Sequence, residues 1–177
     1  LFRSVFFFVL VGMQRIIWTR WRYLTAEDKS NLSGVVIGLI VQRSHGLQKF
    51  SRSKIEQVLA NVCAQSGSLD PVIQVLNHCG TDVEQASAQA AATGAGMEES
   101  LERLQRTVTG LSALRTVLDE ALNMSDPRLT LDQQKAVQAA AKAMVLPATS
   151  LACTVLTHSL STTTEIANSA AGGVQGV

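Results

Sequence analysis

Hydrophobic and polar positions alternate with the period of an α-helix along almost the whole chain. Residues 26–43 illustrate this, because apolar side chains recur there every three or four positions and predict one buried stripe. The stripe consists of Leu32, Val35, Val36, Leu39 and Ile40. Almost no strand-like alternation occurs after residue 20. The pattern therefore predicts an all-α protein.

The turn residues between the apolar runs divide this pattern into six helices. Gly67 and Gly80 follow predicted helix ends. Pro147 lies inside the last helix, which it should kink or divide at Val145 or Leu146 because proline cannot donate the helical hydrogen bond. The predicted helices span residues 3–22, 26–43, 51–66, 69–79, 97–124 and 131–159.

Two further segments are expected to lack packed structure. Residues 81–96 are rich in Ala, Ser and Gly, which predicts a flexible insert with some fraying helix in it. Residues 161–177 predict a disordered tail. The expected domain organisation is therefore helix pairs over 1–80, the insert over 81–96, a long helix pair over 97–160 and the tail.

Helices joined by short turns are expected to pair with their sequence neighbours. The expected antiparallel pairs join 3–22 with 26–43, 51–66 with 69–79, and 97–124 with 131–159. Pairs of about 40 residues are the unit of HEAT-type α-solenoids. The predicted fold class is thus an α-α superhelix of the HEAT or armadillo type. A closed helix bundle is the alternative, since no repeated sequence decides between the two.

The first 24 residues, LFRSVFFFVLVGMQRIIWTRWRYL, raise the question of a membrane anchor. The unbroken apolar run covers residues 5–13, about 13 Å of helix against a hydrocarbon core of about 30 Å. Large and basic residues follow it, which is poor chemistry for signal-peptide cleavage. A buried helix is favoured, and an anchor at residues 4–21 is the alternative. Because the chain begins with Leu1, we expect it to be a fragment.

Composition narrows the range of functions. The chain has 177 residues, of which 46% are hydrophobic and 16% charged, and its net charge of +1 gives no reason to expect nucleic acid. Residues 1–60 hold nine Lys/Arg against three Asp/Glu, whereas residues 61–126 hold three against nine. So low a charge content suits a piece of a larger protein whose apolar surfaces pack on neighbours.

Sequence patterns of catalytic and metal sites are missing. The chain has no P-loop, HExxH, GxSxG or GxGxxG motif. Cys63, Cys79 and Cys153 lack the spacing of zinc ligands and fit reduced thiols of the cytosol or nucleus. The apolar neighbours of Cys63 and Cys153 predict that both are core residues. We expect no enzyme activity, no cofactor and no metal.

One stretch, FFVLVGMQRIIWTRWRYLTAEDKSNLSGVVIGLIVQ, resembles the second HEAT repeat of the importin-β superfamily (karyopherins), in particular of its exportin branch. Exportins carry a helix of the type FFALxxLExxIxxRW, then a short turn with a polar cap and a second helix. The matching residues are Phe7, Phe8, Leu10, Ile16, Ile17, Arg20 and Trp21. A helix like KIEQVLANVCAQ follows in exportins, commonly before a Trp-Pro segment. This chain keeps Asp70-Pro71 there without the tryptophan.

A second stretch resembles the family's LKxLSEEL…LxxxRKxELxxxL segment. Residues 131–135 match its helix cap, and its first part is matched by Leu114, Leu118, Asp119, Glu120 and Leu122. The resemblance covers about residues 5–78 and 108–160. Over residues 18–62 the spacing is closest to the exportin-6 type, with the exportin-4 and exportin-1 types as rivals.

The resemblance implies a role in nuclear export. Karyopherins shuttle between nucleus and cytoplasm, contact nucleoporins and bind the small GTPase Ran in its GTP state through their amino-terminal repeats. Exportins bind protein cargo together with Ran-GTP, and the exportin-6 type carries profilin–actin. No direct contact with nucleic acid, no membrane span and no catalysis are implied.

The second helix of each pair lines the concave surface of such a superhelix. The helix predicted over 26–43 carries a small and polar stripe on a face other than its apolar one. Its members recur at spacings of four and three, and are Glu27, Asn31, Gly34, Gly38 and Gln42. We predict that they form a partner-binding face. The alternative is that Gly34 and Gly38 allow tight packing against a neighbouring helix.

Overall fold

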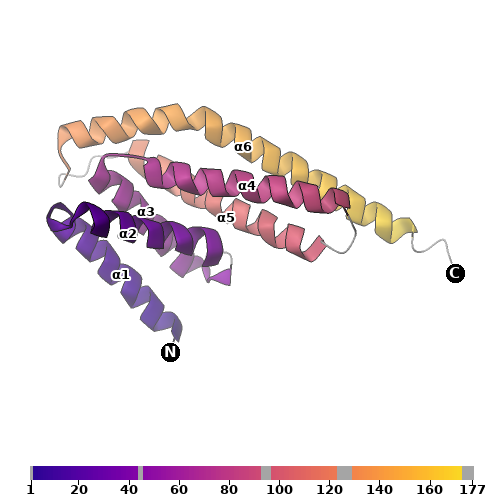
Figure 1. Ribbon diagram of the computed structural model, residues 1–177, viewed down its shortest axis with the longest axis horizontal. Coiled ribbons are helices and arrows are strands. Elements are labelled where there is room, and N and C mark those ends of the chain that lie inside the picture. Colours follow the sequence, from indigo (N-terminus) through magenta and orange to yellow (C-terminus); the bar gives the residue numbers. More distant parts are fainter. Residues whose placement is uncertain (1, 44–45, 93–96, 123–128, 173–177) are drawn as a thin grey trace.

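The computed structural model describes residues 2–43, 46–92, 97–122 and 129–172, which are helical almost throughout (Figure 1). In chain order the elements are α1 (Phe2–Arg20), the 3-10 turn η1 (Trp21–Tyr23), α2 (Ala26–Gly38), the π-helical turn η2 (Leu39–Arg43), α3 (Lys49–Ser66), α4 (Asp70–Ala92), α5 (Met97–Leu122) and α6 (Leu131–Gly172). No strand occurs in these described ranges. The all-α prediction is therefore confirmed.

Local hydrogen bonds set several helix ends where the sequence predicts them. The side chain of Thr25 accepts from the backbone N–H of Asp28 at 3.1 Å, and Asp28 accepts in return from the Thr25 N–H at 3.2 Å. This capping box satisfies two donors that the first turn of α2 would otherwise leave unpaired. Thr130 and Gln133 make the same reciprocal pair at the start of α6. Gly67 ends α3 with a left-handed φ of 67°, which glycine adopts at little cost.

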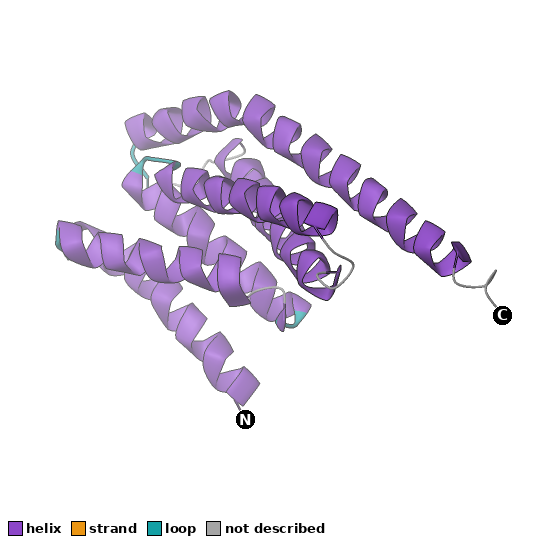
Figure 2. Cartoon of the chain, turned by 45° about the vertical axis from the view of Figure 1, so that its right-hand side comes forward, coloured by secondary structure: helices purple, strands orange, loops and turns teal. Residues whose placement is uncertain are grey.

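A single core forms around α3, which contacts every other α-helix. α3 packs against α1 on one side and against α5 on the other (Figures 1 and 2). The Thr116 hydroxyl of α5 donates at 3.0 Å to Glu56, a buried carboxylate of α3. The largest fully buried side chains are Leu10, Ile17, Val36, Ile40, Ile55, Val58, Leu59, Val62, Leu69, Val72, Val75 and Val117.

The expected helix pairing is only partly correct. The most extensive contact joins α4 to α5, and α1 packs on α3 rather than on α2. Of the expected pairs, α5 with α6 is a major contact, whereas α3 with α4 is a minor one. Short turns fix only where the next helix starts, and side-chain burial decides which helix it packs against. The packing does not establish a repeating superhelix.

Gly110 explains why α4 and α5 approach so closely. A Cβ atom at this position of α5 would overlap the Sγ of Cys79 on α4 and would lie 3.5 Å from the Cγ1 of Val75. Only glycine leaves the space that these two side chains occupy. Both α4 side chains are buried at this contact.

The predicted end of the fourth helix is wrong. α4 does not end before Gly80 but continues to Ala92, so residues 81–92 of the predicted insert are helical. Val83 extends the buried stripe of α4, and Arg103 of α5 lies 3.6 Å from Asp82. These contacts hold an alanine-rich stretch with high helix propensity as a helix. Residues 93–96 lie outside the described part.

α6 is longer than predicted. It continues to Gly172 through most of the predicted tail, and residues 173–177 lie outside the described part. Pro147 stays inside it without dividing it, although Figures 1 and 2 show that α6 changes direction part-way along. Within the described residues, Leu131–His158 is the one stretch long and apolar enough to cross a membrane, by length and composition alone.

Candidate protein-binding face of α2

α2 packs into the core through one face only. Val36, Ile37 and Ile40 are buried, and Leu32 and Leu39 pack partly against the core. The stripe predicted from the sequence is therefore mostly correct, but Val35 is 53% exposed and Ile37 takes its place inside. The positions beside Val35 consequently belong to the open side of the helix.

The five predicted partner-binding residues lie on this open side. Glu27, Asn31, Gly34 and Gln42 are exposed, and Gly38 is half-buried. A Cβ atom built at Gly34 or Gly38 would meet no atom within 4 Å. The described part of the chain thus provides no helix against which the two glycines pack tightly.

The stripe does not follow a regular α-helix to its end. α2 stops at Gly38, and Leu39–Arg43 form the π-helical turn η2. A π turn closes i→i+5 hydrogen bonds, is rare, and often occurs at functional sites. It widens the helix between Gly38 and Gln42, so Gln42 is displaced from the straight line that α-helical spacing predicts. The other four residues keep the predicted alignment.

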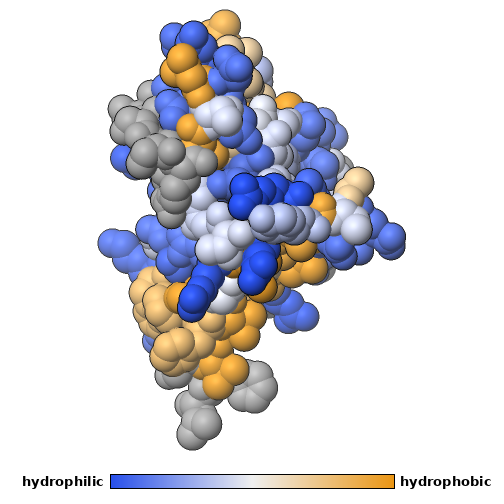
Figure 3. All heavy atoms as spheres, turned by 90° about the vertical axis from the view of Figure 1, so that its left-hand side faces the viewer, coloured by the Kyte–Doolittle hydropathy of each residue, from blue (hydrophilic) through white to orange (hydrophobic). Residues whose placement is uncertain are grey.

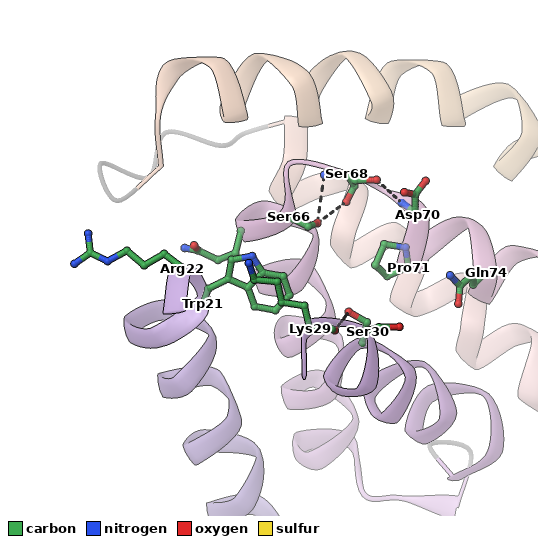
Figure 4. Close-up of a pocket in the computed structure, with 11 residues that line it drawn as sticks. Trp21, Arg22, Lys29, Ser30, Ser66, Ser68, Asp70, Pro71 and Gln74 are labelled. Carbon is green, nitrogen blue, oxygen red and sulfur yellow. Dashed lines mark hydrogen bonds between the residues drawn. The ribbon is translucent and has the colours of Figure 1, made fainter. Parts of the chain in front are cut away.

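A cleft of about 680 Å³ opens on another side of α2 (Figure 4). It lies between η1, α2 and the turn that joins α3 to α4. Most of the residues that line it are polar types, although their apolar atoms contribute more of its surface than their polar atoms. The lining residues are Trp21, Arg22, Lys29, Ser30, Ser33, Gln65, Ser66, Ser68, Asp70, Pro71 and Gln74. None of the five stripe residues lines it. Sequence reasoning missed the cleft because its walls come from segments more than 30 residues apart.

Hydrogen bonds order the α3–α4 side of this cleft. The Ser68 hydroxyl accepts from the backbone N–H of Asp70 at 3.0 Å, and the Ser66 hydroxyl accepts from the N–H of Ser68 at 3.3 Å. Across the cleft, Lys29 lies 5.8 Å from the ring centre of Trp21. Figure 4 shows Arg22 extending away from the other lining residues. Two cations, Arg22 and Lys29, and one carboxylate, Asp70, thus line the cleft.

Comparison with known proteins reveals no relative. No family model matches the chain, and no curated protein or solved structure is similar to it. The resemblance to exportins accordingly stays an expectation that rests on the residues quoted above.

The potential metal ligands of the described residues are dispersed over the helices. Among the described residues, no group of three or more His, Cys, Asp or Glu side chains lies close enough together to hold a metal ion. His78 and His158 belong to different helices, α4 and α6, and His45 lies outside the described residues.

The cysteines differ in their surroundings. Cys63 and Cys79 are buried, whereas Cys153 is exposed on α6, so its prediction as a core residue is wrong. Burial raises the pKa of both buried thiols from 9.0 to about 12, because desolvation disfavours the thiolate. The thiolate is the reactive form, so neither buried cysteine is positioned for nucleophilic or redox chemistry.

We expect one of the three thiols, Cys153, to react rapidly with Ellman's reagent at pH 8, and the other two only after unfolding. Stability should fall above pH 9, because the unfolded state then loses thiol protons that the folded state keeps up to about pH 12. Each buried thiol contributes a slope of about 1.4 kcal/mol per pH unit in that window. Rapid labelling of a Cys153→Ser variant would contradict the burial of Cys63 and Cys79.

Proposed function

We propose that the chain is part of an exportin-like nuclear transport receptor, a protein-binding scaffold for Ran-GTP and protein cargo. One structural observation carries the binding role: α2 presents an open face of small and polar residues around Gly34 and Gly38, with no neighbour near either glycine. The resemblance of residues 5–78 and 108–160 to exportins supplies the identity of the partners. These include cargo such as profilin–actin, and nucleoporins during shuttling between nucleus and cytoplasm.

Such a scaffold works by coupling two binding events. Cargo and Ran-GTP each stabilise the same conformation of a flexible helical array, so each raises the affinity for the other. Hydrolysis of GTP on Ran removes one of the two ligands and releases the second. The proposed role of this chain is to contact protein surfaces through α2, without any chemical step of its own.

Two alternatives lead to different expectations. A helical adaptor unrelated to transport would use the same open face but would not bind Ran. A membrane-anchored protein would place residues 4–21 in lipid, yet Leu10 and Ile17 in that segment are both fully buried in the protein core. A helix with one face in the core is better suited to packing on protein than to crossing a bilayer alone.

The α2 face is tested by filling it. The Gly34→Leu substitution places a large side chain into open space, so it should leave the fold intact and weaken binding of Ran-GTP by about tenfold or more, as expected for blocking the centre of an interface. Gly80→Leu on α4 is the matched control, because a Cβ there also meets nothing within 4 Å. Equal affinity of the Gly34→Leu variant and the wild-type chain would exclude α2 as the Ran-binding face.

A further inference from the structure

α1 has an apolar face that the described structure leaves uncovered. One side of the helix enters the core through Leu10 and Ile17. On the other side, Val5, Val9 and Ile16 are 56%, 53% and 47% exposed, and Phe8 beside them is 70% exposed. Figure 3 shows apolar side chains gathered at the lower end of the molecule, where Figure 1 places α1. Exposed patches of this kind mark interaction sites.

The outer face has the spacing of a helix–helix seam. Steps of four, three, four and three residues connect Val5, Val9, Gly12, Ile16 and Thr19. This 3.5-residue period is that of positions a and d in a heptad, where the side chains of a partner helix interlock. Gly12 sits in the middle of the seam, and a Cβ there would meet nothing within 4 Å. A glycine at this point lets a second backbone approach closely.

Charge next to the seam indicates which helix fits. Arg15 precedes a seam residue and Arg20 follows one, so both occupy the flanking g and e positions of the heptad, and both are exposed. α1 contains no Asp or Glu. In paired helices the flanking positions choose the partner by charge. A helix with carboxylates along its flanks is therefore complementary to α1.

Other occupants fit less well. Two copies of α1 would bring arginines against arginines with no carboxylate to offset them, and like charges at such positions disfavour pairing. A lipid surface would gain nothing from the heptad period or from a glycine in the middle of the apolar strip. The seam thus favours a protein helix of opposite flank charge.

We propose that this outer face of α1 docks a protein helix with an apolar heptad seam and carboxylates along its flanks. The site is separate from the open face of α2, which contributes no residue to it. The docking therefore does not depend on the proposed Ran-binding role, and either one can fail without the other.

The test measures binding of synthetic helices to the full chain by fluorescence anisotropy. The probe is a helix of about three heptads, with leucine at positions a and d and glutamate at e and g. Its twin carries lysine in place of glutamate. We expect the glutamate helix to bind about tenfold or more tightly than the lysine helix. The double substitution Arg15→Glu, Arg20→Glu should reverse this preference without changing the fold, because both arginines are exposed.

A matched pair of variants controls for folding. Val9→Glu interrupts the seam and should abolish binding of both peptides. Val35→Glu makes the same change on α2 at a residue of equal exposure, 53%, and should leave binding intact. Equal binding of the two peptides, or no effect of Val9→Glu, would overturn the proposal. So would a Val9-dependent dimer in sedimentation velocity, or Val9-dependent binding to phosphatidylserine vesicles in place of peptide.

Discussion

Replacing Gly110 with alanine is expected to lower the free energy of unfolding by about 2–3 kcal/mol, a typical result of overpacking a core. The added methyl group would overlap the Sγ of Cys79, which lies on α4 against this position of α5. Chemical denaturation followed by circular dichroism measures the loss. The double variant Gly110→Ala, Cys79→Ala should regain part of the stability, since the overlapping atom is removed.

Gly80 provides the control for this prediction. It lies inside α4, and a Cβ there meets no atom within 4 Å. Gly80→Ala should therefore stabilise the protein by up to about 1 kcal/mol, the gain in helix propensity when alanine replaces glycine. If Gly110→Ala also stabilised the protein, α4 and α5 could not pack as closely as described.

Ile17→Ala is expected to destabilise the protein by about 2–5 kcal/mol, the usual cost of truncating a fully buried aliphatic side chain. Ile17 joins α1 to the core and has no exposed surface. Its neighbour Ile16 is 47% exposed, so Ile16→Ala should change stability by about 0.5 kcal/mol or less. Denaturation midpoints of the two variants give the comparison. Similar effects of both substitutions would mean that α1 does not enter the core through the Ile17 face.

The sequence was sufficient to predict most of the helices but only one of the three expected helix pairs, α5 with α6. Periodicity places most of them, and local chemistry predicts an end such as the one at Gly67. Pairing across the core depends on shape. At Gly110, for example, the absence of a side chain leaves room for Cys79 and so allows α4 to pack against α5. Nothing in a linear pattern marks that glycine as different from Gly80.

The longer helices show how tertiary contacts override a local prediction. The stretch after Gly80 looks flexible by composition, yet Val83 is buried and Asp82 lies near Arg103 of α5. These contacts involve residues about 20 positions apart, which no window of helical period includes. The apolar stripe of residues 32–40 was predictable because its members recur with a helical period along one short segment. The cleft beside Trp21 was not predictable, because it forms between segments that are distant in the sequence.

Most variants proposed above change one surface at a time. Gly34→Leu affects the open face of α2, and Val9→Glu affects the outer face of α1. Neither position lies in the core, so a loss of binding can be separated from a loss of fold by circular dichroism on the same samples.

The proposed transport role depends most directly on nucleotide-selective binding of Ran. The measurement is biolayer interferometry of the full chain with Ran locked in its GTP form or its GDP form. We expect binding to Ran-GTP that is at least about tenfold tighter than binding to Ran-GDP, a difference of about 1.4 kcal/mol. Absence of binding to either form, by a chain shown to be folded and helical, would contradict the exportin-like role and leave a helical protein with another partner.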